Sequence, residues 1–278
     1  MNCFGIPEFI LFPDPPATIR AIFSTGSDRS VNIVLNLQKT PDFNPVYIYH
    51  NPITMISKET FSFLKELKAN NYKEWFDEHR NQYAVLRKQF EQFIDVVIAE
   101  ISLFDKDGAQ TTAKASIFRI NRDIRFSNDK NPYKTNFGAF IAKGGRKGSH
   151  AGYYIHVEPG ECFLAGGIYM PSGPMLKAIR EEIYDNIDTF KAIVHQPSFV
   201  KHFEGKLWEE KLKTAPKGFP KDFPDIEYLK YKHYTVAKNE PDKIYWQPEF
   251  IHEVREVFLA MKDFNAFLNR AVEHVERA

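Results

Sequence analysis

The chain has 278 residues, an aromatic content of 15% and a formal net charge of +1. The length and the aromatic content exclude a disordered chain and allow one large domain with a substantial core. The near-neutral charge excludes a protein whose overall field attracts nucleic acid or an anionic membrane, so any preference for anions must arise from local clusters.

Cysteine usage and hydropathy indicate a cytoplasmic protein without membrane partners. The two cysteines, Cys3 and Cys162, have neither metal-site spacing nor the pattern of a disulfide framework, which is typical of a reducing compartment. No apolar run approaches the roughly 20 residues of a membrane span. The N-terminus also lacks the basic region of a signal peptide.

Residues 1–54 differ in composition from the rest of the chain. They hold seven of the 17 prolines, and about 13% of them are charged, against about 29% in residues 55–278. We therefore expect an atypical N-terminal extension over 1–54 and a single domain over 55–278, with Met55 rather than Met1 as the natural start. The alternative is a genuine N-terminal arm with a short strand at Val31–Leu37.

Helical patterns come first in the predicted domain. Ser57 can cap a helix whose apolar face is Phe61, Leu64 and Leu67. Apolar residues then recur at helical spacing from Tyr83 to Ile101, which predicts a long amphipathic helix.

The pattern then changes to that of strands. Strand-like segments are Ser116–Phe126, Asn136–Lys143, the two halves of Gly152–Met170 on either side of a turn at 158–161, and His233–Lys238. The short links favour an antiparallel meander, because parallel neighbours need crossovers of about a dozen residues or more.

Helices return after the predicted sheet. Ser172 can cap a helix that has Pro174 in its first turn and continues, as one helix or with a break, through Ile187 to Val194, and a last helix runs from about Pro248 to the C-terminus. Helices, then strands, then helices predict an α+β fold. We expect an antiparallel sheet of about four to six strands covered by long amphipathic helices.

The stretch RINRDIRFSNDKNPYKTN, residues 119–136, has an unusual density of charge. From Lys114 to Lys147 the chain has nine cations and two acids, a local net charge of +7 on a chain whose total is +1. The glycine-rich basic loop Lys143–Gly148 can close over a bound anion or simply connect two strands. Such a local field attracts anionic ligands.

Strand alternation places arginines on one face of this stretch. Arg119, Asn121, Asp123 and Arg125 would share a polar face, with Arg122 on the other. Two guanidinium forks on one face can grip a phosphate or carboxylate bidentately, and Asp123 would hold one fork in place. The alternative is an exposed ladder of arginine and aspartate with no ligand.

The residues after this segment extend the predicted site. Asn131 and the proline that follows favour a turn, so Lys130 and Lys134 can return over the same face, while Tyr133 lines its wall and Asn136 helps to orient the ligand. The predicted ligand-binding residues are Arg119, Arg122, Asp123, Arg125, Lys130, Tyr133, Lys134 and Asn136.

The pattern R-x-x-R-D-x-R-F-x-x-x-K-x-P-Y-K-x-N resembles the signature of an uncharacterised bacterial and fungal family, domain of unknown function number 2461. All ten fixed positions match it: Arg119, Arg122, Asp123, Arg125, Phe126, Lys130, Pro132, Tyr133, Lys134 and Asn136. The resemblance includes FLKELKANNYKEWFDEHR before this pattern and GGIYMPSGPMLKAIREEI after it, and covers roughly residues 55–278. Because the family's activity is not established, the resemblance implies no catalytic residues.

Other candidate chemistry is weaker. His156 and Glu158 share a strand face and His150 lies upstream, but no second cluster has metal-ligand spacing, so we expect a hydrogen-bonded pair rather than a metal site. Cys162 is predicted to be a small packed thiol. The chain has no P-loop, G-x-S-x-G elbow or dinucleotide fingerprint, so no cofactor is assigned.

Three functions remain open. The first is binding of a phosphorylated or carboxylated small molecule, with enzymatic processing undecided; electrostatic stabilisation of developing negative charge would be the simplest catalytic role. The second is a nucleic-acid-binding module that uses the same basic face, with affinity that falls steeply with salt. The third is a non-catalytic structural or partner-binding protein in which the basic stretch forms internal salt bridges.

Overall fold

The computed structural model describes residues 21–23, 33–35, 47–48, 53–125, 127–208 and 210–277. The chain divides into two compact units, Met1–Pro52 and Ile53–Ala278. In the first unit, β1 (Ala21–Phe23), β2 (Ile33–Leu35) and β3 (Tyr47–Ile48) form an antiparallel sheet in that order. β2 falls within the strand of the alternative interpretation. The rest of that strand, and Cys3, lie outside the described residues.

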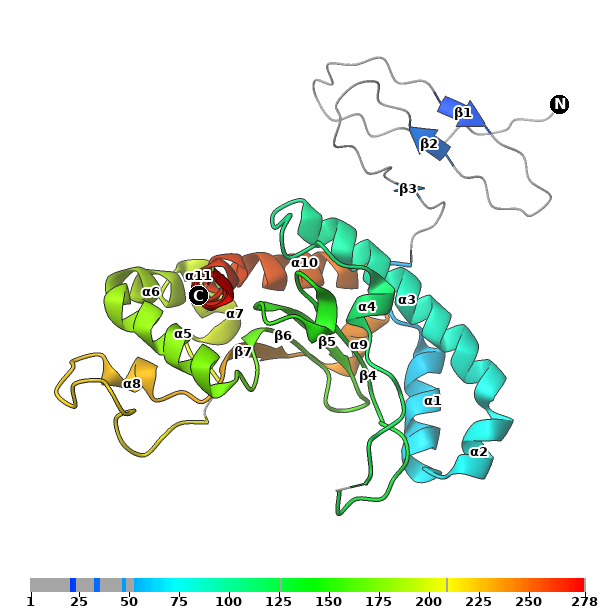
Figure 1. The fold of residues 1–278 in the computed structure, drawn as a ribbon. Coiled ribbons are helices and arrows are strands. Elements are labelled where there is room, and N and C mark those ends of the chain that lie inside the picture. Colours follow the sequence, from blue (N-terminus) through cyan, green and yellow to red (C-terminus); the bar gives the residue numbers. More distant parts are fainter. Residues whose placement is uncertain are drawn as a thin grey trace. The chain divides into compact units, whose positions relative to one another are not determined.

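The second unit is built on an antiparallel sheet of four strands (Figure 1). The strands are β4 (Phe137–Ile141), β5 (Gly152–Val157), β6 (Phe163–Ile168) and β7 (Tyr234–Asn239), paired in this order. Each of these segments was predicted as a strand. The α+β prediction is confirmed, with the strand number at the low end of the expected range.

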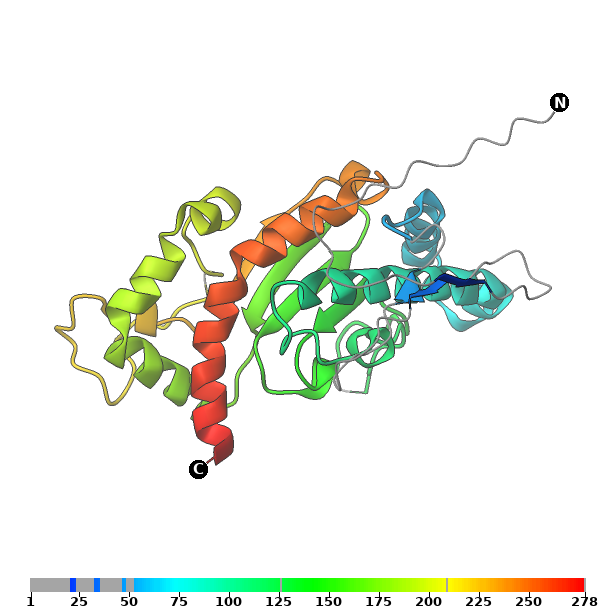
Figure 2. The same ribbon diagram turned by 90° about the horizontal axis from the view of Figure 1, so that it is seen from above.

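Long helices cover one face of this sheet. Phe90 of α3 (Arg80–Ser102) packs on Phe137, and Phe258 of α10 (Phe250–Ala260) packs on Tyr153, with ring centroids 5.4 and 5.1 Å apart. Figure 2 shows α3 and α10 crossing over the sheet, with α11 (Lys262–Arg277) continuing beyond α10. The strand residues beneath them are buried. Hydrophobic burial on this face therefore holds the two layers together.

The predicted helix caps are present. Ser57 accepts a hydrogen bond from the backbone N–H of Thr60 at the start of α1 (Lys58–Ala69), and Ser172 accepts one from Met175 at the start of α5 (Gly173–Asp185). The last predicted helix is instead two helices, α10 and α11, separated at the buried residue Met261. The remaining helical segments are α2 (Lys73–Glu78), α4 (Ala113–Ser116), η1 (Gly145–Lys147), α6 (Ile187–Val194), α7 (Pro197–Phe203), α8 (Ile226–Leu229) and α9 (Asp242–Tyr245).

The prediction of a strand over Ser116–Phe126 was wrong. The described part of this segment contains the end of α4 and two isolated bridges, at Ile117 and Asn121, and Phe126 lies outside the described residues. The backbone of Arg122 still donates to the carbonyl of Pro132 at 2.9 Å, so the two arms pair at intervals rather than as a continuous ladder.

Local hydrogen bonds of two aspartates explain this irregular backbone. Asp123 accepts from the backbone N–H of Arg125 at 3.3 Å, and Asp129 accepts from the backbone N–H of Asn131 at 3.0 Å. Such side-chain contacts offer the backbone an alternative to a strand ladder. The face of arginines deduced from strict alternation therefore does not form.

Within the part of the chain that the structure describes, no helix combines the length and the apolar character needed to cross a membrane.

Candidate functional site

The sheet face opposite α3 and α10 forms the floor of a cavity of about 560 Å³. Residues with small side chains on this floor leave space above the sheet. Ala165 and Ala237 are directly paired on neighbouring strands, and Gly167 follows on β6. Aromatic side chains line the space above and around them: Phe118, Phe140, Tyr154, Phe163, Tyr169 and Trp208. We call this space the open-face cavity. Its aromatic lining suits an apolar ligand group.

Two cations, Lys134 and Arg146, lie at this cavity, and a third, Arg119, acts on Lys134 through its charge. Lys134 Nζ is 5.0 Å from the ring centroid of Phe118, a lining residue, and Arg146 also lines the cavity. Burial and then the charges of Arg119, Arg146 and Arg122 lower the pKa of Lys134, which places these groups in one electrostatic neighbourhood. We call Arg119, Lys134 and Arg146 the basic cluster.

No carboxylate among residues 53–125, 127–208 and 210–277 forms an ion pair with a member of the basic cluster. Arg146 is fixed by backbone carbonyls instead: its Nη1 donates to the oxygen of Ala115 at 2.6 Å and to that of Lys114 at 3.2 Å. This positions the Arg146 side chain without neutralising its charge.

The outer part of the basic stretch, residues 122–131, behaves differently, and we call it the tip. Arg122 forms an ion pair with Asp129, and Arg125 binds Asp123 through both Nε, at 2.9 Å, and Nη2, at 2.7 Å. Lys130 donates to a backbone carbonyl within the same loop at 3.2 Å. The tip therefore supplies internal partners for three of the predicted ligand-binding cations.

Tyr133 has a structural position in the described chain. The residue is 6% exposed, and its ring stacks on that of Phe76, with ring centroids 4.0 Å apart. The side chain of Asn71 forms two hydrogen bonds with the backbone of Tyr133: it donates to the carbonyl at 3.0 Å and accepts from the N–H at 3.1 Å. These contacts anchor the basic stretch to the first helices, so Tyr133 holds the neighbouring Lys134 in place rather than lining the cavity.

Asn136 leads to a polar chain on the cavity floor. Its Nδ2 lies 3.4 Å from Nδ1 of His156, and the hydroxyl of Tyr154 lies 3.0 Å from the same nitrogen. Nε2 of His156 lies 3.2 Å from Oε2 of Glu158, whose other oxygen accepts from Thr135 at 2.7 Å. His156 and Glu158 thus form the hydrogen-bonded pair expected from the sequence.

The protonation of this polar chain follows from its surroundings. Burial lowers the pKa of His156 and, with the charge of Glu158, raises the pKa of Tyr154. Burial also acts to raise the pKa of Glu158, but hydrogen bonds from Thr135 and His156 outweigh it, so this pKa is lowered. At neutral pH the chain therefore has a neutral phenol, a neutral imidazole and a carboxylate.

Comparison with known proteins gives a family but no activity. The model of the family DUF2461, described as a conserved hypothetical protein, matches residues 59–267. The chain belongs to the DUF2461 family. None of the curated proteins and none of the solved structures matches it. The matched segment of this DUF2461 protein contains the open-face cavity, the basic cluster and the tip.

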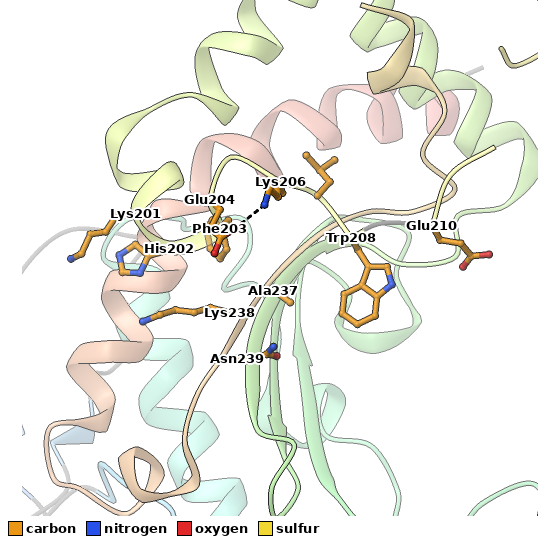
Figure 3. A pocket seen from close by; sticks show the side chains of 11 residues that line it. Lys201, His202, Phe203, Glu204, Lys206, Trp208, Glu210, Ala237, Lys238 and Asn239 are labelled. Atoms are coloured by element: carbon orange, nitrogen blue, oxygen red, sulfur yellow. Dashed lines mark hydrogen bonds and ion pairs between the residues drawn. The ribbon is translucent and has the colours of Figure 1, made fainter. Parts of the chain in front are cut away.

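A second cavity, of about 840 Å³, lies along β7 and shares Trp208 and Ala237 with the first. Figure 3 shows Lys201, His202 and Lys238 at one end and Trp208 at the other. Its lysines have carboxylate partners: Lys201 with Glu256 at 3.3 Å, Lys206 with Glu204 at 3.0 Å, and Lys238 with Glu240 at 2.6 Å. This second cavity therefore lacks the uncompensated charge found beside the first.

Sequence reasoning found only part of the site in this DUF2461 protein. Arg146 was counted among the local cations but not assigned to the site, and Tyr154 was missed although it alternates with His156 on one strand. Trp208 gave no signal, because it reaches the cavity from a loop distant in sequence. In the described chain, no group of three or more His, Cys, Asp or Glu side chains is arranged to hold a metal ion.

Proposed function

We propose that this DUF2461 protein binds a phosphorylated or carboxylated small molecule in the open-face cavity, with the anionic group held by Arg119, Lys134 and Arg146. The observation that carries the proposal is that Arg119, Lys134 and Arg146 form no ion pair with a carboxylate of the described residues. The charge of Arg119 acts on Asp123, but the ion-pair partner of Asp123 is Arg125. Mutual repulsion disfavours such a group of cations, and a bound anion relieves it.

The cavity supports an apolar or aromatic part in the same ligand. Its volume of about 560 Å³ lies within the range of roughly 300–1,000 Å³ typical of small-molecule sites. Phe118 connects the aromatic lining with the cations, since it lines the cavity and also contacts the Lys134 ammonium. A ligand with an aromatic ring and a phosphate or carboxylate group can therefore contact both the aromatic lining and the basic cluster.

The charge distribution favours one compact anion over a polyanion. Arg122 and Arg125 are paired with aspartates inside the tip, so the described basic stretch has no long ridge of uncompensated cations. Nucleic-acid binders need several such cations to neutralise successive phosphates. The ion pairs inside the tip support the third function, a structural role of the basic stretch, for Arg122 and Arg125 only.

We also propose that the protein resides in the reducing cytoplasm. Cys162 is a buried free thiol, and burial raises its pKa to about 12, which keeps it protonated and unreactive. A thiol in this state is compatible with a reducing compartment.

Isothermal titration calorimetry with phenyl phosphate, benzoate and inorganic phosphate tests the proposed ligand class. We expect phenyl phosphate to bind more tightly than inorganic phosphate, because its ring buries apolar surface in the cavity. The variant Lys134→Gln should weaken phenyl phosphate binding about tenfold, through the loss of one charge-assisted contact.

Lys147→Gln is the matched control. Lys147 lies in η1 beside Arg146, is exposed and does not line the cavity. The same loss of charge at this position should change the affinity by less than about twofold. Equal losses in the two variants, or no binding of any of the three compounds to the wild type, would refute the proposed site.

A further inference from the structure

At the open-face cavity, hydrogen bonds connect three side chains in the way that a nucleophile, its base and a residue that orients the base are connected in enzymes. Oη of Tyr154 lies 3.0 Å from Nδ1 of His156, and Nε2 of His156 lies 3.2 Å from Oε2 of Glu158. Tyr154 and His156 line the cavity, whereas Glu158 does not. A nucleophile within hydrogen-bond reach of a base that a third group orients is the arrangement used in covalent catalysis. We call these three residues the Tyr154 relay.

Glu158 fixes the tautomer of His156. A carboxylate only accepts hydrogen bonds, so the imidazole proton resides on Nε2 and donates to Glu158. Nδ1 then carries a lone pair that faces two donors, the hydroxyl of Tyr154 at 3.0 Å and, farther away at 3.4 Å, Nδ2 of Asn136. His156 is held in this orientation because its ring stacks on Phe163, with centroids 4.5 Å apart. Thr135 and Lys68 hold Glu158 in turn, at 2.7 and 3.6 Å.

The position of the Tyr154 hydroxyl depends on a glycine in the adjacent strand. A Cβ atom on Gly138 would lie 2.7 Å from Oη of Tyr154, closer than such atoms approach in proteins. Gly138 pairs directly with His156 across β4 and β5. The sheet therefore makes space at the one place where this hydroxyl meets its base.

We propose that Tyr154 is a nucleophile that accepts the phosphoryl group of a phosphate monoester bound in the open-face cavity, with His156 as the base. The inference rests on the proposed anion site, since the basic cluster would hold the phosphate oxygens. Phe118 is a neighbour of both the basic cluster and the Tyr154 relay. It contacts Lys134 and packs against Tyr154, with ring centroids 6.1 Å apart.

The reaction has two balanced steps. In the first, the Tyr154 oxygen bonds to phosphorus, the bond from phosphorus to the ester oxygen breaks, Nδ1 of His156 takes the phenolic proton, and the departing alkoxide, on the far side of phosphorus, takes a proton from solvent water. In the second, water attacks the phosphotyrosine and releases a proton to solvent, while the imidazolium of His156 returns its proton to the Tyr154 oxygen as the bond to phosphorus breaks. The sum is one ester and one water converted to one alcohol and one phosphate.

The surroundings of the relay act on both partners of the proton transfer. Burial and the charge of Glu158 raise the pKa of Tyr154, so its proton has to leave as the new bond forms. Burial keeps His156 neutral at pH 7, and therefore able to accept a proton, while Glu158 stabilises the imidazolium that forms. The basic cluster would stabilise the negative charge on the transferring group. A free phenolate is not required, because the proton leaves as the new bond forms, as in a serine–histidine pair.

Labelling of the full chain by benzenesulfonyl fluoride tests the inference without knowledge of the natural ester. Its tetrahedral sulfur is an electrophile similar to phosphorus, and attack by a phenol releases fluoride. We expect peptide mapping by mass spectrometry to show modification at Tyr154 before Tyr169, which also lines the cavity and is 67% exposed. Faster labelling of Tyr169, or of Lys134, would refute the activation of Tyr154.

Variants separate activation from simple exposure. His156→Gln should slow labelling of Tyr154 about 100-fold, the usual effect of removing a general base, and Gly138→Ala should slow it by displacing the hydroxyl. Glu158→Gln provides a second, isosteric variant should His156→Gln fail to fold. Unchanged labelling rates in these folded variants would overturn the proposal.

The pH profile gives an independent readout. With a neutral imidazole as base, the labelling rate should rise through the pKa of His156, which burial lowers from its ordinary value, and should be constant above it. An unassisted phenol would instead react about ten times faster for each pH unit up to its own pKa. A continuous rise of this kind in the wild type would exclude the relay.

Protection by phenylphosphonate, which has a ring and an anion like phenyl phosphate but no ester bond to cleave, distinguishes the two proposals. Labelling that phenylphosphonate blocks supports both the anion site and the relay. Labelling of Tyr154 that depends on His156 but is not blocked would refute the anion site and leave the relay as the reactive group. Calorimetric binding of phenylphosphonate without any labelling of Tyr154 would refute the relay and leave the anion site intact.

Discussion

The tip and the basic cluster come from the same charged stretch but have opposite electrostatic environments. In the tip, Arg122 and Arg125 are paired with Asp129 and Asp123. In the basic cluster, no member forms an ion pair with a carboxylate of the described residues, and burial, followed by the charges of neighbouring arginines, lowers the pKa of Lys134. Both aspartates lie within the tip. The position of the few acids, rather than the density of cations, therefore decides where an anion can bind.

The largest expected effect, on the free energy of unfolding, comes from removing the contact between the basic stretch and the first helices. Tyr133→Ala removes the ring that stacks on Phe76, and we expect unfolding to cost about 3 kcal/mol less, as for other large aromatic truncations. Urea denaturation followed by circular dichroism measures this change. Tyr133→Phe, which keeps the stacked ring, should remain near wild type, and a similar loss in both variants would contradict the role of stacking.

The next effect distinguishes the cluster from its charged surroundings. The double variant Arg119→Gln with Arg146→Gln should weaken phenyl phosphate binding about 30-fold, or about 2 kcal/mol, by removing two charged hydrogen-bond donors. The control is Lys143→Gln with Lys147→Gln, which removes the same charge from exposed positions that do not line the cavity. Calorimetric affinities that fall equally in both pairs would show a general charge effect and no specific site.

The sequence predicted the parts of this molecule that depend on local patterns. The caps at Ser57 and Ser172 and the strands β4 to β7 follow from residue types and spacing. The strand expected at Ser116–Phe126 failed because the aspartates of the tip satisfy the backbone locally, which alternation does not reveal.

The site itself was only partly predictable, because it depends on contacts distant in sequence. Alternation shows that Tyr154 and His156 share a face of β5. It does not show that this face forms the floor of a cavity, or that Gly138 leaves room for the Tyr154 hydroxyl. The convergence of Lys134 and Arg146 beside Phe118 also requires the tertiary fold, since they belong to different segments of the chain.

A smaller effect concerns the proton balance of ligand binding. The pKa of Lys134 lies below 10.5 because burial and neighbouring positive charges disfavour the ammonium form. A bound phosphate favours that form and raises the pKa again, so binding takes up protons above the lowered pKa. We therefore expect phenyl phosphate affinity to fall as the pH rises through the lowered pKa, in the range above about pH 8 where the phosphate is fully ionised.

Calorimetry in two buffers with different ionisation enthalpies measures this proton uptake directly. The uptake should disappear in Lys134→Gln and persist in Lys147→Gln. An uptake that survives in Lys134→Gln would assign it to another group and remove Lys134 from the anion site.

The smallest expected effect lies in the tip, where Asp123→Asn removes the ion pair between Asp123 and Arg125. Because this pair is exposed and lies outside the residues that line the cavity, we expect phenyl phosphate affinity to change by less than about twofold. Asp129→Asn tests the second pair in the same way. A clear gain in affinity in either variant would mean that the arginine of that pair reaches the ligand. The two aspartates would then restrain a larger anion site, and the boundary between the tip and the basic cluster would have to be drawn elsewhere.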